Sequence, residues 1–358
     1  MTGGNGRPRV AASRPRVAVD GEDSRCLMEG LLGLQIHEGA DGLSSCEATF
    51  GNWGTKDNRI TFLYFDRRQL DFGRELTIGI GDGTLFQGRI SGVEAQFPEG
   101  QQPRIAVLAE DRYQDLRMVR RTRTFTDVTD ADVFRQVATD HGLRADVQLP
   151  EVSYRVLAQL NQSDLAFLRE RARTIDAELW MSGSSLLARP RADRSGASLR
   201  LGYGNELRDF VVLADLAGQR SSVTVGGWDV AGKQPLTETA GESVVAGELA
   251  GGRSGASVLA GALGQRAESI VHSVPFTSRE AQARAEAAYK HIARRFLVGR
   301  GVADTSADLQ VGAKVRLEHL GELFSGPYYV TEVTHLFDDE LGLRTEFAVE
   351  RTGLGGQS

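Results

Sequence analysis

The sequence predicts a mainly β protein with two β-barrels of similar design and an α+β insert between them. Three observations lead to this prediction: a three-strand pattern occurs twice, the residues between the two copies change to a helical period, and the composition suits a chain with packed cores. The two copies span residues 73–110 and 312–350. They lie too far apart for a solenoid, so the recurrence indicates two related domains produced by an internal duplication.

Each copy enters a strand from a glycine, turns tightly, continues through a Leu-Phe-x-Gly strand and closes on a strand that ends in Glu. Short β-meanders share such features by chance, but the ordered match of three strands favours duplication. Alternation places Phe86 and Phe324 on the core side, so we expect them at equivalent buried positions. The matched residues are Gly73, Leu76, Ile78, Phe86, Val93 and Glu110 in the first copy and Gly312, Val315, Leu317, Phe324, Val333 and Glu350 in the second.

Length and composition set the class of protein. A chain of 358 residues with 41% hydrophobic and 25% charged residues is long enough for two or three domains. The net charge of −6 argues against a sequence-independent nucleic-acid binder, which needs a basic face for phosphates. Only four of the 42 basic residues are lysines. The codon usage of a GC-rich genome is the simplest explanation for this excess of arginine over lysine. The alternative is that arginine guanidinium groups bind an anionic partner.

The two cysteines and the first residues argue against export and zinc binding. Cys26 and Cys46 form no Cys-x-x-Cys spacing, and both fall on expected strands as small core residues. Residues 1–15 lack the apolar run of a signal peptide, so we expect a disordered arm, with docking on assembly as the alternative. No run is long enough to span a bilayer. We therefore expect cytoplasmic synthesis and no membrane insertion.

Residues 16–111 alternate throughout and predict the first barrel, with a hairpin turn at residues 81–83. Residues 112–200 predict the α/β insert. Its first helix begins at a capping box on Thr129 and ends at Gly142, and its second helix follows Ser163. A hairpin over residues 177–189 completes the insert.

Residues 201–352 predict the second barrel, and residues 353–358 a short tail. Within it, residues 232–272 are rich in Gly, Ala and Ser with little periodicity, which predicts an extended or mobile connection. A capping box at Thr277 opens the longest helix, over residues 278–298. The alanines on one side of this helix predict close approach to another surface.

No motif of catalysis, cofactor binding or metal binding is found. The sequence has no Gly-x-Ser-x-Gly elbow, no His-Glu-x-x-His and no P-loop, and the glycines at 79, 81 and 83 lie in a hairpin. The six histidines are scattered, and His319 and His335 on expected strands are better explained as hydrogen-bonded ladder residues than as metal ligands. A carboxylate pair for glycoside hydrolysis stays open, but no neighbours single one out. We therefore predict a non-enzymatic protein with no catalytic, cofactor-binding or metal-binding residues.

Several strings resemble one family, the phage late control gene D family. It comprises the tail hub proteins of contractile phages and is related to the hub part of type VI secretion spikes and of extracellular contractile injection systems. The most specific string is QLNQSDLAFLRERA at residues 159–172. The resemblance covers roughly residues 16–352. The other strings lie at residues 122–125, 130–143, 228–236, 326–335 and 345–351.

This resemblance implies a fold, an assembly and a set of partners. Each chain of such a hub contributes two barrels that resemble the tail-tube subunit, and three chains present six barrels in a ring. The homotrimer then joins a six-fold inner tube to a three-fold spike, and the duplication fits that symmetry mismatch. The implied partners are the inner tube protein, baseplate wedge proteins and LysM-type baseplate proteins. Because the sequence ends at Ser358, before any OB-fold or β-helix needle, we expect the spike to be a separate polypeptide.

Two other classes of function stay open at this stage. The first is a peptidoglycan hydrolase or an effector-carrying spike component on the same scaffold, which needs opposed carboxylates or a metal. The second is a carbohydrate-binding β-protein, since small barrels often bind sugars. That second class leaves the long alanine-faced helix and the repeated strands unexplained. The hub is therefore the preferred prediction, in a phage virion or an injection system.

Overall fold

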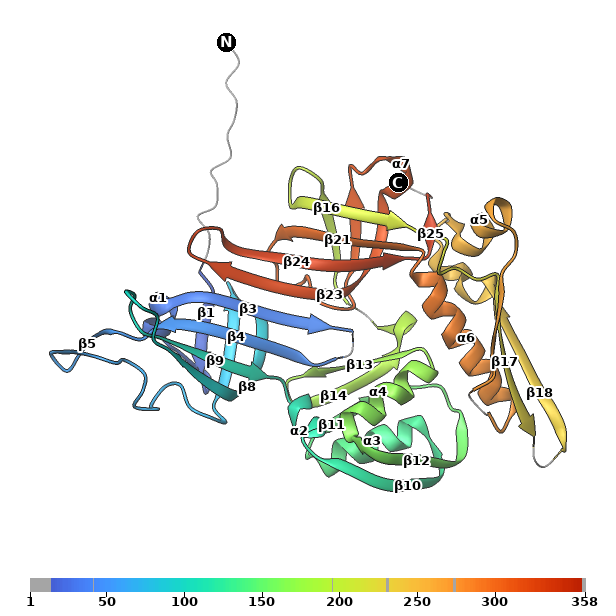
Figure 1. Ribbon diagram of the computed structural model, residues 1–358, viewed down its shortest axis with the longest axis horizontal. Helices are drawn as coiled ribbons and strands as arrows, with labels where there is room; N and C mark the ends of the chain where they lie inside the picture. The colour runs from blue at the N-terminus through green and yellow to red at the C-terminus, as the bar shows by residue number, and fades with distance from the viewer. Residues whose placement is uncertain (1–13, 41, 195, 230–231, 273–274, 356–358) are drawn as a thin grey trace, which may run out of the picture.

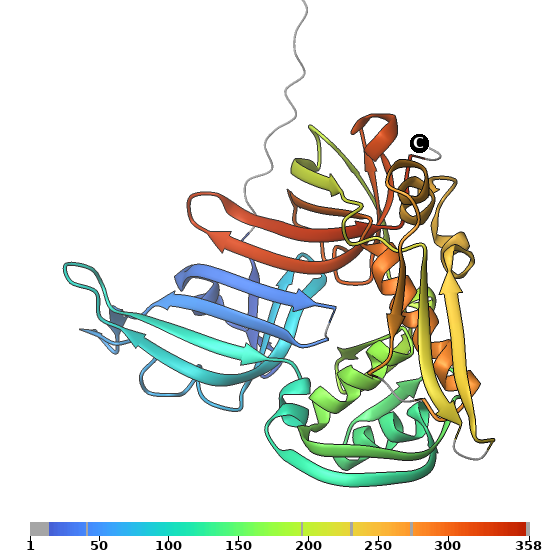
Figure 2. The ribbon, with the colours of Figure 1, turned by 45° about the vertical axis from the view of Figure 1, so that its right-hand side comes forward.

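The computed structural model describes residues 14–355 except 41, 195, 230–231 and 273–274, so most of the predicted arm and half of the predicted tail lie outside the described residues. The protein is mainly β. Figures 1 and 2 show the first β unit in blue beside the second in red, with the insert in green below both. A long helix and a small sheet form the remaining side of the molecule.

The first β unit builds six strands into one antiparallel order, β1-β7-β8-β9-β4-β3. A two-residue strand extends its edge, a short helix precedes β3, and a small hairpin (β5, β6) projects from the long segment that follows β4. The elements are β1 (Arg16–Val19), β2 (Glu22–Asp23), α1 (Arg25–Gly30), β3 (Leu31–Gly39), β4 (Ser44–Gly51), β5 (Gly54–Lys56), β6 (Arg59–Thr61), β7 (Glu75–Ile80), β8 (Gly83–Gln96) and β9 (Arg104–Glu110).

The second β unit has the same strand order, β15-β22-β23-β24-β21-β16. Taken along the chain, the first to sixth strands of each unit occupy the same places in the sheet. One pairing differs in direction, because β15 runs parallel to β22 whereas β1 runs antiparallel to β7. The elements are β15 (Ser198–Gly202), β16 (Leu207–Ala214), β21 (Leu297–Asp304), β22 (Lys314–Glu318), α7 (Gly321–Phe324), β23 (Gly326–Asp338), β24 (Gly342–Arg351) and β25 (Gly353–Leu354).

Hydrogen bonds place the two meanders in matching register. The amide of Gly73 donates to the carbonyl of Ile90, and the amide of Gly312 donates to the carbonyl of Val330, at 2.8 and 3.0 Å. A β-bulge follows each acceptor, after Ile90 in β8 and after Val330 in β23. Both closing strands then end in a glutamate, Glu110 or Glu350. The predicted match of these strand entries, bulges and ends therefore agrees with the observed pairing.

The predicted equivalence of Phe86 and Phe324 is wrong. Phe86 lies in β8 opposite Ile78, and the residue opposite the matching Leu317 is Gly326. Phe324 lies two residues earlier, in α7, and is only partly buried. The turn before β23 is longer than the two-residue turn before β8, and its extra residues form this short helix, which takes Phe324 out of the strand.

Val93 and Val333 are equivalent by register, since Val93 pairs with Val107 and Val333 with Phe347. Their environments differ, because Val93 is 36% exposed and Val333 is 1% exposed. The second half of β23 also pairs with β3, whereas the second half of β8 pairs with β9 alone. The predicted barrels are not found as separate closed barrels, because β3 pairs with β23 and the main strands of the two units share one sheet, whose path runs from β16 to β2.

The insert agrees with the sequence prediction. Thr129 forms a capping box with Asp132 at the start of the first helix, and Ser163 caps the second. The apolar sides of both helices pack into one core with Tyr113 and Leu186. The elements are α2 (Tyr113–Arg117), β10 (Arg120–Thr129), α3 (Asp130–Asp140), β11 (Arg144–Val147), β12 (Ser153–Ser163), α4 (Asp164–Thr174), β13 (Ala177–Ser182), β14 (Ser185–Pro190) and η1 (Arg191–Asp193).

The predicted mobile connection over residues 232–272 is wrong. These residues fold with β17 into a small sheet of order β18-β17-β20, which covers α6. Small side chains made the hydrophobic period of these residues too weak to recognise in the sequence. In the structure, Ala240, Val245 and Ala256 are buried against the alanine side of α6. The elements are β17 (Ser222–Asp229), β18 (Gln234–Gly241), η2 (Glu242–Glu248), β19 (Arg253–Ser254), α5 (Gly255–Ala262), β20 (Ala267–Ile270) and α6 (Ser278–Arg294).

Three local predictions need smaller corrections. Cys26 lies on α1 and is exposed, while Cys46 is buried as expected. His319 lies just after β22 with a φ of +64°, and only His335 is a ladder residue, bonded to the hydroxyl of Thr345. None of the helices in the described part combines the length and apolar character that crossing a bilayer requires.

Candidate functional site

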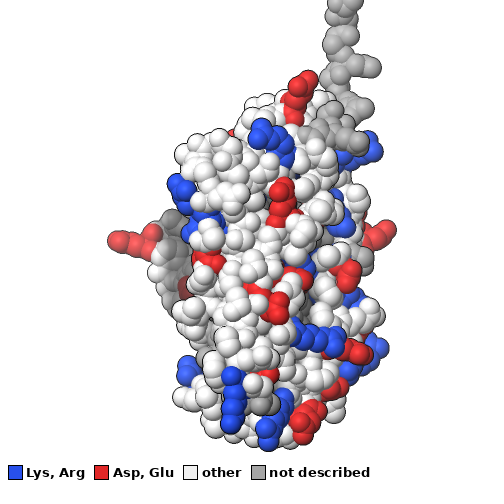
Figure 3. All heavy atoms as spheres, turned by 90° about the vertical axis from the view of Figure 1, so that its right-hand side faces the viewer, with Lys and Arg blue, Asp and Glu red and all other residues white. Residues whose placement is uncertain are grey.

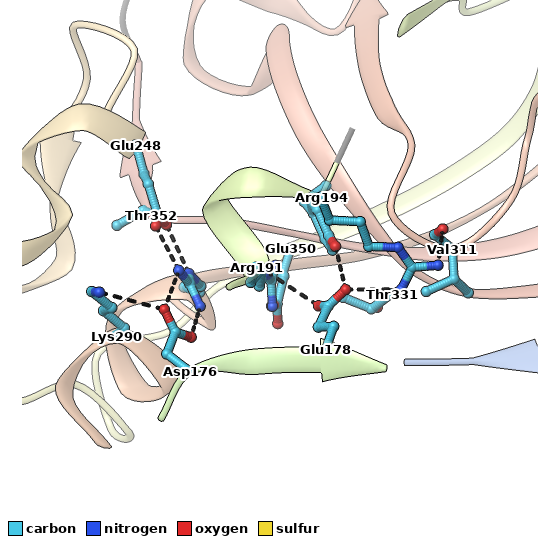
Figure 4. Close-up of polar contacts among 12 residues, drawn as sticks. Asp176, Glu178, Arg191, Arg194, Glu248, Lys290, Val311, Thr331, Glu350 and Thr352 are labelled. Carbon is cyan, nitrogen blue, oxygen red and sulfur yellow. Dashed lines mark hydrogen bonds and ion pairs between the residues drawn. The ribbon is translucent and has the colours of Figure 1, made fainter. Parts of the chain in front are cut away.

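A network of ion pairs lies where the insert and the second β unit meet η2 and α6 (Figure 4). We call this network the junction. Its members come from β13, η1, η2, α6 and β24, so it connects parts of the fold that are distant in sequence. The junction residues are Asp176, Glu178, Arg191, Arg194, Glu248, Lys290, Arg294 and Glu350.

Arg294 is the central cation of the junction, and its side chain is 4% exposed. It donates to both carboxylate oxygens of Asp176, which lies in the insert between α4 and β13, and its Nε and Nη2 donate to Glu248 of η2 at 2.8 and 2.7 Å. Burial by itself would raise the pKa of Glu248, but the hydrogen bonds and charge of Arg294 outweigh burial and lower that pKa. Arg294 therefore holds α6, η2 and the insert together as one ionised cluster.

Arg194 and Arg191 make the second half of the junction. Arg194 donates to Glu178 at 2.9 Å and to the carbonyl of Val311 at 2.6 Å, which ties the end of the insert to the second β unit. Arg191 pairs with Glu350 on β24, and its guanidinium lies 3.9 Å from the ring centre of Tyr329. The hydroxyl of Tyr329 donates to Glu178, so strand β23 joins the same network.

Asp111 marks the border between the first β unit and the insert, one residue after β9. Its carboxylate accepts from the amides of Ser44 and Tyr113, at 2.8 and 2.9 Å. Burial nevertheless raises the pKa of Asp111 to about 7, with smaller contributions from the charges of Glu38 and Glu110. Burial also raises the pKa of Glu38, which lies 3.8 Å from Arg194. This border therefore contains carboxyl groups that favour the protonated form.

We expect this border to make the protein less stable as the pH rises. An unfolded aspartate titrates near pH 4 and Asp111 in the folded protein at about 7, so the folded state holds the extra proton between these values. The free energy of unfolding should fall over that window by on the order of 3 kcal/mol. Urea unfolding at pH 5 and pH 8 measures it. Asp111→Asn, which does not titrate, should reduce the difference, and an unchanged difference would contradict the assignment.

The chemistry of the junction is that of a structural clamp. Its carboxylates are bound by arginine or lysine, and no group of three or more His, Cys, Asp or Glu in the described part is placed to hold a metal ion. The junction residues could not be predicted from the sequence, because Asp176 and Arg294 are separated by 118 positions and no local motif links them.

An exposed group of aromatic rings lies at the other end of the molecule, near the β5–β6 hairpin, and we call it the aromatic cluster: Trp53, Phe62, Phe65 and Phe97. The rings of Phe62 and Phe65 stack at 4.7 Å, yet Phe65 and Phe97 are 37% and 63% exposed. The buried Asn52 orders this loop, since its side-chain oxygen accepts from the amides of Leu63 and Tyr64. Ordered apolar surface of this kind is typical of protein contact sites.

The comparisons with known proteins point to one fold. A family model described as the Alg8 N-terminal domain matches residues 16–339. The prophage MuSo2 43 kDa tail protein from Shewanella oneidensis superposes with a TM-score of 0.68 at 13% identity, covering 95% of this chain and 98% of that one. A tail protein from Neisseria meningitidis MC58 gives 0.67 at 13% identity, covering 96% and 98%.

A third similar structure is the E. coli c3393 protein, described as a component of the type VI secretion system with structural similarity to the T4 bacteriophage tail proteins gp27 and gp5. Its TM-score is 0.59 at 11% identity, and the match covers 96% of this chain and 79% of that chain. No curated protein matches the sequence. At these identities the likeness establishes that this chain has the fold of these tail and secretion proteins.

Proposed function

The chain belongs to the family described as the Alg8 N-terminal domain, and from its fold we propose that it is a structural part of a phage-tail-like particle. The observation that carries the proposal is the extent of the fold likeness, which spans 95% of this chain and 98% of a tail protein. Within such a particle we assign it the role of baseplate hub, as in the late control gene D family that its strings resemble.

The repeated strand order supports a hub in particular. Two units with one topology and matching bulges fit an internal duplication, in which each unit would take the place of one tube subunit. Three chains would then offer six similar units to a six-fold tube and keep three-fold symmetry for a spike. Closed rings need such repeated interfaces. The proposed assembly is therefore a homotrimer that adapts the inner tube to a separate OB-fold or β-helix spike.

The remaining partners follow from the same role. Baseplate wedge proteins and LysM-type baseplate proteins would bind the outside of the ring, after synthesis in the cytoplasm and assembly into the virion or injection system. No nucleic-acid partner is proposed, because the net charge is −6. On the side of the molecule drawn in Figure 3, basic and acidic residues are interspersed over a mostly uncharged surface.

The mass of the hub in its assembled complex tests this proposal. Native mass spectrometry of the complex with tube and spike proteins should give three copies of the chain. A complex with a single copy would contradict the hub. Isolated chain is not the decisive sample, because partners often complete such ring interfaces.

We propose that the chain has no catalytic activity of its own. The buried carboxylates of the junction are held in ion pairs, which leaves them unsuited to act as the acid and base of a hydrolase. Zymography on bacterial cell walls checks this. Clearing by the purified chain would favour the alternative role, a peptidoglycan-degrading or effector-carrying spike component.

We expect the aromatic cluster to contribute to the ring interface. A ring needs a head-to-tail contact between two different surfaces of the chain, and this cluster lies at one end of the molecule (Figure 1). The double variant Phe65→Ser/Phe97→Ser should lower stability by only about 1–2 kcal/mol, since Phe97 is 63% exposed and Phe65, which stacks on Phe62, is 37% exposed. It should weaken assembly at least tenfold, measured by analytical ultracentrifugation of the reconstituted complex. Leu160→Ser, at an exposed position of the insert, is the matched control; equal assembly of the two variants would contradict the assignment.

A further inference from the structure

A pocket of about 470 Å³ opens beside the junction, between the insert, the α6 segment and the second β unit. Its size falls in the range of about 300–1,000 Å³ that is common for ligand sites, which often lie between domains. The aromatic rings of Tyr328 and Tyr329 form part of its wall, and Thr352 adds a hydroxyl. Its charged lining residues are Arg191, Glu248, Lys290, Arg294, Lys314, Glu350 and Arg351.

Two of the cations that line this pocket lack an acidic partner. The other three, Arg191, Lys290 and Arg294, are in ion pairs. By contrast, neither Lys314 nor Arg351 has an ion pair with a carboxylate in the part of the chain that the structure describes. The pocket therefore holds more positive than negative charge, although the chain as a whole has a net charge of −6.

Arg351 is the more informative of the two, because it is 4% exposed. Its terminal nitrogens donate to the backbone carbonyls of Ser325 and Gly355, while its Nε is buried without a hydrogen-bond partner. Two carbonyl hydrogen bonds and the ring of Tyr328, whose centre lies 5.5 Å from the guanidinium carbon, stabilise this buried charge, but no carboxylate neutralises it. Lys314, at an exposed position of β22, adds an ammonium group to the same pocket.

We propose that this pocket binds a carboxylate on an acidic segment of a partner protein. A glutamate or aspartate side chain would bind the Lys314 ammonium directly and add the negative charge that this side of the pocket lacks, and Tyr328, Tyr329 and Thr352 can contact the adjoining peptide. The inference rests on the proposed function in one respect: it takes the ligand to be part of a protein, as expected for a member of a protein assembly. It adds a specific contact: a partner bound here touches the insert, α6 and β24 together, so its binding depends on how these three parts are arranged.

Isothermal titration calorimetry with an acetylated and amidated hexaglutamate peptide tests the proposal, at about 0.1 M salt so that long-range attraction is screened. The blocked peptide restricts the carboxylates to side chains, and a hexaglutamine peptide of the same length is the uncharged control. Lys314→Glu should weaken hexaglutamate binding at least tenfold. Lys233→Glu makes the same change at an exposed lysine that does not line the pocket, and should leave binding within about twofold.

Each outcome decides the proposal. Tenfold weakening by Lys314→Glu alone supports it. Absence of hexaglutamate binding, equal binding of hexaglutamine, or equal loss in both lysine variants overturns it. Inorganic phosphate serves as a second probe, and a site that binds phosphate but no hexaglutamate is an anion site of another kind, which also overturns the proposal. A failure here leaves the hub intact, because the copy number in the assembled complex tests the hub separately.

Discussion

Arg294→Met should lower the free energy of unfolding by about 3–5 kcal/mol. The substitution keeps much of the side-chain volume but removes five N–H donors, and it leaves Asp176 and Glu248 without their main counter-charge. When a buried ion pair loses one member, the other is left as an uncompensated charge. This destabilises the folded protein more than loss of both members does. Urea unfolding of the purified chain, followed by circular dichroism, measures the change.

Arg208→Met is the matched control for this prediction. Arg208 also pairs with an aspartate, Asp304, but both side chains are 54% exposed. Water screens such a pair, so we expect a loss below about 1 kcal/mol. Equal losses in the two variants would show that burial does not set the strength of the junction, and the structural role assigned to Arg294 would be wrong.

The junction also explains why the protein uses buried charge in this position. Charge-assisted hydrogen bonds are directional, so the planar Arg294 guanidinium, which donates to Asp176 and Glu248, restricts the positions that the two carboxylates can take. Apolar contacts between the same parts would tolerate sliding. The hub role that we propose requires a defined orientation of the parts of the chain, and the junction supplies it between the insert, α6 and the second unit.

The elements that the sequence predicted well are those set by local interactions. Thr129 and Ser163 cap helices through atoms three residues away, and the stripes behind them bury Val133 and Leu168. Hydrophobic period and cap chemistry lie within one window of sequence, so they can be recognised before any tertiary contact is known. The hairpin of β13 and β14 was predictable for the same reason.

Contacts between distant residues could not be predicted in this way. The pairing of β3 with β23 joins residues about 300 positions apart, and it turns two expected barrels into one continuous sheet. Nothing in either strand indicates its partner, because alternation specifies a buried side and not a neighbour. In residues 232–272, alanine and glycine gave too weak a period to reveal strands, although α6 buries their small side chains.

The error at Phe324 has a testable consequence, which compares two phenylalanines from the same Leu-Phe-x-Gly string. Phe86→Ala should lower the free energy of unfolding by about 3–5 kcal/mol, because Phe86 is 3% exposed in the core of the first unit. Phe324→Ala, which was expected to be equally severe, should cost only about 1 kcal/mol, because that ring lies partly exposed on α7. Paired urea titrations of the two variants give the difference. Equal losses would indicate that Phe324 lies in a strand beside β22 and would contradict the observed register. A difference of about 2 kcal/mol or more is expected between a fully and a partly buried ring. Such a difference supports the register in which Gly326 occupies the place of Phe86.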